Sequence, residues 1–191
     1  MRPPTDGDRE RLSFRGGGRT REIPEAAPGV RGAFSNPMRH VAFSMQFRGH
    51  STRLSPGVLT ARATAPSSAL VTEVDPDGVH GRLEIRDGQE AHLECRLTFL
   101  DDTRFEEVGT ISFGNGNALR FRSAAEGTLA DAAEPGLRHG AVTWEIDDGA
   151  GAFEGASGRI VSNFLLSDTG ELTDNQLGVL FLPGPERKDT R

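Results

Sequence analysis

The chain has 191 residues, a formal net charge of −6 and a pI near 5.4, which is enough protein for one domain with a sizeable core. The acidic balance argues against a nucleic-acid partner, and no apolar run approaches the ~20 residues that a membrane span needs. Cys95 is the single cysteine, which rules out an internal disulfide and favours a reducing, cytoplasmic location.

Residues 1–37 differ from the rest of the chain because they are rich in proline, glycine and arginine and carry few apolar side chains. Such a segment cannot bury enough surface to offset its ordering entropy, so we expect a flexible tail. A second interpretation is a lid that closes over a bound ligand. The main domain is then expected over residues 38–183, followed by a polar C-terminal tail over 184–191.

From residue 40 onward, alternating apolar and polar residues are punctuated by Asp-Gly and Asn-Gly pairs, which favour tight hairpin turns. Residues 124–137 are expected to be irregular or briefly helical. Consecutive hairpins predict an all-β fold, a single antiparallel β-barrel of about eight to ten strands, with a β-sandwich as the alternative. The predicted strands are 40–53, 57–65, 68–75, 79–86, 89–100, 103–113, 117–126, 138–147, 157–167 and 171–182.

The period-two pattern also assigns an inner face to each strand, because successive side chains point to opposite sides of a sheet. The inner sides are predominantly apolar and the outer sides charged. We expect the larger inner side chains to line an apolar cavity that binds a substrate. These predicted substrate-binding residues are Phe43, Met45, Phe47, Phe105 and Trp144.

Glu107 interrupts this pattern because it shares the apolar phase of its strand with Phe105 and Ile111. A lone buried carboxylate is costly unless it is paired or protonated, and a raised pKa would make it a candidate acid, base or hydrogen-bond donor. The alternatives are a register slip that turns Glu107 outward beside Glu106, or a buried pair with an arginine.

The last predicted strand is also mixed. Asp174 and Gln176 share one face with apolar residues, Asn175 shares the other face with apolar residues, and either face could point inward. A few polar groups inside an apolar pocket are typical of a small-molecule site, although they also occur where hydrogen bonds close the end of a barrel. We therefore predict Glu107, Gln176 and Asp174 as catalytic residues and add Asn163 to the substrate-binding set.

Residues 142–146, 149–160 and 162–164 carry a Gly-x-Gly-x-Phe-x-Gly-Ala-x-Gly segment between two strands. This stretch resembles the C-terminal half of allene oxide cyclase-like (calycin-like) barrel proteins. The resemblance implies a barrel in which Phe153 plugs one end.

Residues 48–60, 105–113 and 173–182 look like the bacterial spirotetramate- and spirotetronate-forming cyclases of that superfamily. Those small barrels fold a linear polyene and promote an intramolecular [4+2] cycloaddition in polyketide pathways. The resemblance implies a cyclase of the Diels-Alderase type with an apolar polyene substrate, but it does not supply the site residues named above.

The histidines are isolated and no paired-cysteine motif occurs, so we expect no metal and no cofactor. A cycloaddition needs neither, since its main demand is to hold the reacting groups in a near-attack conformation. The alternatives are a lipocalin-like binding protein without catalysis and a partner-binding barrel with a filled interior. A homodimer also stays open.

Overall fold

The structure, a computed structural model, describes residues 38–184, so the expectations for residues 1–37 and 185–191 lie outside the described residues. It is nearly all-β, and within the described residues no helix is long and apolar enough to span a membrane. The strands are β1 (Arg39–Ser55), β2 (Val58–Ala65), β3 (Ser68–Asp75), β4 (Gly78–Ile85), β5 (Ala91–Phe99), β6 (Arg104–Ser112), β7 (Ala118–Ser123), β8 (Gly127–Asp131), β9 (Leu137–Ala150), β10 (Ser157–Ser167) and β11 (Glu171–Leu182).

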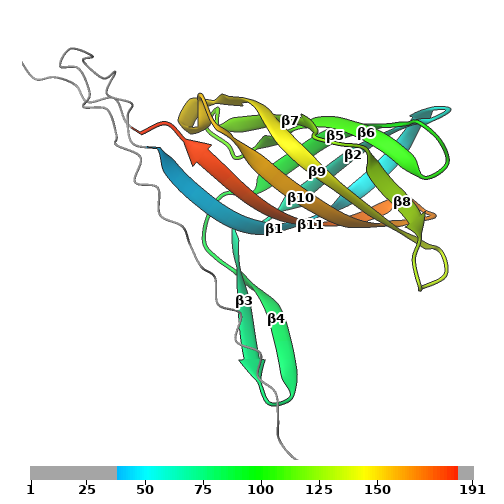
Figure 1. The fold of residues 1–191 in the computed structure, drawn as a ribbon, viewed down its shortest axis with the longest axis horizontal. Helices are drawn as coiled ribbons and strands as arrows, with labels where there is room; N and C mark the ends of the chain where they lie inside the picture. Colours follow the sequence, from blue (N-terminus) through cyan, green and yellow to red (C-terminus); the bar gives the residue numbers. More distant parts are fainter. Residues whose placement is uncertain (1–37, 185–191) are drawn as a thin grey trace, which may run out of the picture. The chain divides into compact units, whose positions relative to one another are not determined.

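Eight strands close into the predicted antiparallel barrel, in the order β1, β2, β5, β6, β7, β9, β10 and β11 (Figure 1). The ring closes because β11 pairs with β1 along most of its length and β9 pairs with β10. Closure leaves no long unpaired edge within this ring, and each strand keeps an apolar side toward the interior.

One local prediction is wrong, the irregular or helical conformation expected for residues 124–137, and two of the predicted strands lie outside the barrel wall. Residues 127–131 form the short strand β8, which pairs with the ends of β6 and β9 and continues the place of β7 in the wall. Strands β3 and β4 are not part of the barrel wall, because they pair only with each other as a separate two-stranded hairpin (Figure 1). Both hairpin strands alternate like wall strands, so periodicity alone does not distinguish the two arrangements.

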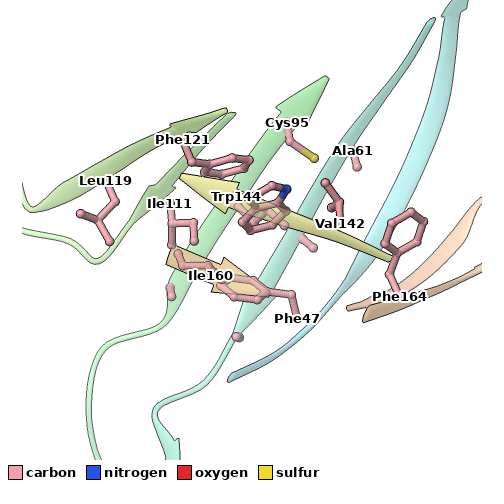
Figure 2. Close-up of a cluster of buried hydrophobic side chains, with 14 of the residues drawn as sticks. Phe47, Ala61, Cys95, Ile111, Leu119, Phe121, Val142, Trp144, Ile160 and Phe164 are labelled. Atoms are coloured by element: carbon pink, nitrogen blue, oxygen red, sulfur yellow. The ribbon is translucent and has the colours of Figure 1, made fainter. Parts of the chain in front are cut away.

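Aromatic side chains fill the barrel interior (Figure 2). The rings of Phe121 and Trp144 stack with centroids 3.9 Å apart. Gly109 makes room for this stack, because a Cβ added there would lie 2.5 Å from Cζ of Phe121. At one end of the barrel, Phe153 of the short 3₁₀ turn Gly151–Phe153 is half-buried, with its ring 5.0 Å from that of Phe113. Phe153 packs against the core, and its role as a plug stays a prediction from the resemblance.

Candidate functional site: two buried carboxyl groups

Glu107 lies on the inner face of β6, with only 4% of its surface exposed. It pairs in register with Leu97 of β5 and keeps the phase of Phe105 and Ile111, so no register slip turns it outward. Among the described residues it has no arginine partner either. The carboxyl group is therefore buried without a compensating cation.

The hydrogen bonds to Glu107 come from neutral donors. The indole Nε1–H of Trp144 donates to Oε2 at 2.9 Å, and the thiol of Cys95 is a second hydrogen-bond partner. Burial is the main cause that raises the pKa of Glu107 to about 7, and the nearby charge of Asp174 adds to the rise. The bonds from Cys95 and Trp144 act in the opposite direction. Near neutral pH, Glu107 is thus divided between its acid and its carboxylate form.

Asp174 is the second buried carboxyl group and lies on the inner face of β11. Its oxygens accept hydrogen bonds of 2.7 Å from the Ser162 hydroxyl and from Nε2 of Gln176. Burial raises the pKa of Asp174 to about 6, against the effect of these two donors. Among residues 38–184 the buried carbonyl oxygen of the Gln176 side chain has no hydrogen-bond partner.

The two carboxyl groups share a small cavity of about 20 Å³. That volume holds roughly one water molecule. Apolar side chains form most of its wall, including Leu59, Leu93, Leu97, Phe164, Leu166 and Leu172. The barrel interior is thus mostly filled, and residues 38–184 do not form the open, aromatic-lined cavity that the sequence predicted.

A larger hollow of about 370 Å³ lies where the β1–β2 and β5–β6 turns approach the start of β9. Arg53, Phe99 and Arg138 line it, and Leu59 lines both this hollow and the buried cavity. Leu59 is thus part of the wall of the buried cavity and of the wall of this outer hollow.

The predicted substrate-binding residues do not form one surface. Phe47, Phe105 and Trp144 are fully buried packing residues that do not line the cavity, although Trp144 contacts Glu107. Phe43 and Met45 are half-buried and line a different hollow, together with Phe113 and Asn117.

Asn163 lies on the outer face of the barrel, which corrects the prediction that it lines the interior. It is exposed between the inward Ser162 and Phe164, because successive residues of β10 alternate between the two faces. Its backbone carbonyl accepts a bond from Asn175, also on the outside.

Ser162 and Cys95 are the polar neighbours of the two carboxyl groups that sequence reasoning did not assign to the site. Ser162 shares the inward phase of Ile160 and Phe164, and this phase was the available signal. Cys95 was interpreted as a packing residue. It is buried, and burial followed by the charge of Glu107 raises the pKa of its thiol well above the usual value, so it contributes as a neutral partner.

No protein-family model matches this chain, and no curated protein is similar to it in sequence. Among solved structures, it is similar to the pterocarpan synthase dirigent protein GePTS1, with 17% identity and a TM-score of 0.45 over 84% of this chain and 97% of that chain. It is also similar to the pterocarpan synthase dirigent protein PsPTS1, with 15% identity and a TM-score of 0.44 over 75% of this chain and 96% of that chain. At these values the activity of those proteins does not transfer to this chain.

Proposed function

We propose that this chain is a cofactor-independent cyclase that takes a linear polyene into its barrel and promotes an intramolecular [4+2] cycloaddition in a natural-product pathway of the spirotetramate or spirotetronate kind. One observation carries the proposal: Glu107, with a pKa of about 7, adjoins a cavity with a mainly apolar wall and is held by Trp144. Strongly shifted carboxyl groups in apolar sites are typical of catalytic acids and bases.

In this proposal the protonated Glu107 donates a hydrogen bond to a carbonyl group conjugated to the dienophile. The bond withdraws electron density as the two new carbon–carbon bonds form, and a preorganised donor in a dry site stabilises this charge shift. Three π bonds of the substrate become two σ bonds and one π bond, so the product is an isomer of the substrate. Asp174 and Gln176 supply further polar contacts that orient the ring bearing the carbonyl.

The proposal requires the barrel to open, because ligand pockets usually have volumes of about 300 Å³ or more. The residues for this change are those between the cavity and the outer hollow, with Leu59 as the shared side chain. Displacement of Leu59 would join the buried cavity to the 370 Å³ hollow and let a substrate reach Glu107.

The test is incubation with a linear polyene that carries a tetramate ring, followed by chromatographic separation of isomers of unchanged mass. We expect a faster appearance of one cyclised isomer with the native protein. Replacing Glu107 by Leu, which cannot donate a hydrogen bond, should lower kcat about 100-fold, which is typical for loss of one such donor. Glu106→Leu is the matched control on the outer face and should leave kcat unchanged. Cyclisation no faster than in buffer would overturn the proposal.

The filled interior favours a second candidate, a barrel that has no internal ligand and serves as a partner-binding scaffold. Quenching of the single tryptophan, Trp144, by the same polyene separates the candidates. Quenching with cyclisation supports the cyclase, and quenching without cyclisation supports a lipocalin-like carrier. A polyene that neither quenches nor reacts supports the filled scaffold.

A further inference from the structure

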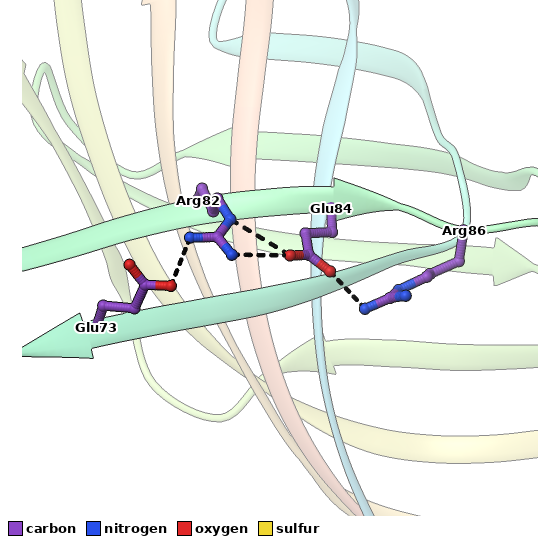
Figure 3. Close-up of polar contacts among 4 residues, drawn as sticks. All are labelled: Glu73, Arg82, Glu84 and Arg86. Carbon is purple, nitrogen blue, oxygen red and sulfur yellow. Dashed lines mark hydrogen bonds and ion pairs between the residues drawn. The ribbon is translucent and has the colours of Figure 1, made fainter.

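The β3–β4 hairpin has two chemically different faces. In the register that pairs Leu70 with Leu83 and Val74 with Val79, one face carries no charged side chain. The opposite face is charged: Figure 3 shows Arg82 bound to Glu73 and Glu84, and Glu84 bound in turn to Arg86. The members of the uncharged face, here termed the hairpin face, are Ser68, Leu70, Thr72, Val74, Val79, Gly81, Leu83 and Ile85.

The hairpin face is largely uncovered within the described chain. Val74 is 77% exposed, Val79 70% and Ile85 66%. A two-stranded hairpin is marginally stable in water unless an apolar face packs against something. The hairpin strands pair with no other strand, so the apolar face requires a partner surface.

A second exposed apolar surface lies on the outside of the barrel, across β10 and β11. Leu177, Val179 and Phe181 follow one another on the outer side of β11, and Val161 of β10 pairs with Leu177. These side chains are 41–57% exposed, and Leu165 of β10 extends the surface. We term this set of five residues the barrel face; Arg159, paired with Val179, borders it.

We propose that two copies of this chain form a dimer in which the hairpin face of each copy packs on the barrel face of the other. Both surfaces consist of extended strands, so they can stack as two sheets about 10 Å apart. A two-fold axis repeats the contact and covers all four apolar faces of the pair. This inference does not depend on the proposed function, because neither surface includes Glu107 or its cavity.

The area favours the reciprocal arrangement over a single contact. Eight residues at about 3.4 Å each and two strands about 4.8 Å apart give the hairpin face a footprint of roughly 270 Å². One contact would then bury about 500 Å² in total, which is the size of a nonspecific crystal contact. Two contacts bury about 1,000 Å², which reaches the lower limit for a specific interface. The absence of charge from the hairpin face also favours an apolar partner over an acidic or basic one.

The test is light scattering on the full chain at micromolar concentration, which we expect to give twice the chain mass of 20.5 kDa. Val79→Glu and Leu177→Glu should each give the mass of one chain, because each places a charge in both contacts and neither position is paired with a cation on the neighbouring strand. His80→Glu lies next to Val79 on the charged hairpin face, and Val108→Glu lies on the outer side of β6; both controls should remain dimeric. Circular dichroism of every variant checks that the barrel is intact.

Mass alone does not identify which faces meet, so cysteines are introduced on the two faces in separate chains. A mixture of Val79→Cys and Val179→Cys chains should form a mixed disulfide under mild oxidation, while the native Cys95 stays buried. A monomeric native chain would overturn the proposal. A dimer that survives Leu177→Glu, or crosslinks only between two Val79→Cys chains, would overturn it as well, because the hairpins would then meet each other.

Discussion

Replacing Glu107 by glutamine removes an ionisable group from the barrel interior and nearly preserves the shape of the side chain. The amide oxygen can still accept the hydrogen bond from Trp144, which donates at 2.9 Å in the native protein. The variant therefore isolates the free energy of placing a titratable group at this site, and it does so without any knowledge of a ligand.

The sign of the effect follows from proton binding. The unfolded chain releases the proton of Glu107 near its ordinary pKa of 4.5, whereas the folded protein holds it until pH about 7. Between these values the folded state binds more protons, so the free energy of unfolding falls as pH rises and levels off above pH 7. The difference between these two pKa values corresponds to a loss of about 3 kcal/mol in the free energy of unfolding. Asp174 also lowers the free energy of unfolding as the pH rises from 3.8 to about 6.

We therefore expect Glu107→Gln to have similar stability to the native protein at pH 5 and to be more stable by about 3 kcal/mol at pH 8. Denaturant unfolding at several pH values, followed by the fluorescence of Trp144, gives the free energies. Glu106→Gln is the control, because Glu106 is exposed on the same strand. A difference between Glu107→Gln and the native protein that stays constant from pH 5 to pH 8 would refute the reasoning.

Three further predictions concern the same interior. The fluorescence of Trp144 should titrate with a midpoint near pH 7 in the native protein, and this transition should vanish in Glu107→Gln. Gly109→Ala should lower the free energy of unfolding by about 2 kcal/mol in denaturant titrations, because the added methyl group overlaps its neighbours. Cys95 should react with a thiol reagent only at the rate of unfolding, and rapid labelling of the native protein would contradict its burial and raised pKa.

The inward phase of Glu107 could be predicted from sequence because it depends on alternation alone, whereas for Asp174 and Gln176 alternation left either face of the strand as the inner one. All three lie on the inner face, in phase with buried neighbours on their own strands. Their catalytic role stays a prediction. Asn163 was misplaced because the prediction did not apply this alternation to its strand. Asn163 follows the inward Ser162, so its side chain points outward.

The size of the cavity could not be predicted in this way, because alternation says which side chains face inward and not whether they meet. Four inward glycines decide this point. Gly109, Gly127, Gly140 and Gly178 lie beneath the rings of Phe121, Phe105, Phe164 and Phe43, so aromatic side chains occupy space that Cβ atoms would otherwise exclude. In the sequence, these glycines are indistinguishable from glycines of turns or bulges.

The short strand β8 and the β3–β4 hairpin show a second limit of prediction from the alternation of apolar and polar residues. Residues 127–131 lie next to an alanine-rich stretch, and a five-residue strand gives too few alternations to outweigh that composition. Residues 68–85 alternate well, but an apolar face is the same signal whether it packs against the barrel core or against another molecule. Periodicity identifies the face that needs a partner and leaves the partner to be found in the structure.

Glu107 and Asp174 have no stabilising role that would explain their position. Neither forms an ion pair within residues 38–184, and each lowers stability as it ionises, so neutral residues of similar shape would make a more stable barrel near neutral pH. A group that costs stability at its site is most simply explained by chemistry performed there. A gain in stability at pH 8 in Glu107→Gln, together with a loss of cyclisation in Glu107→Leu, would show this exchange at one position. A gain in stability with unchanged cyclisation would instead show that Glu107 does not promote the reaction.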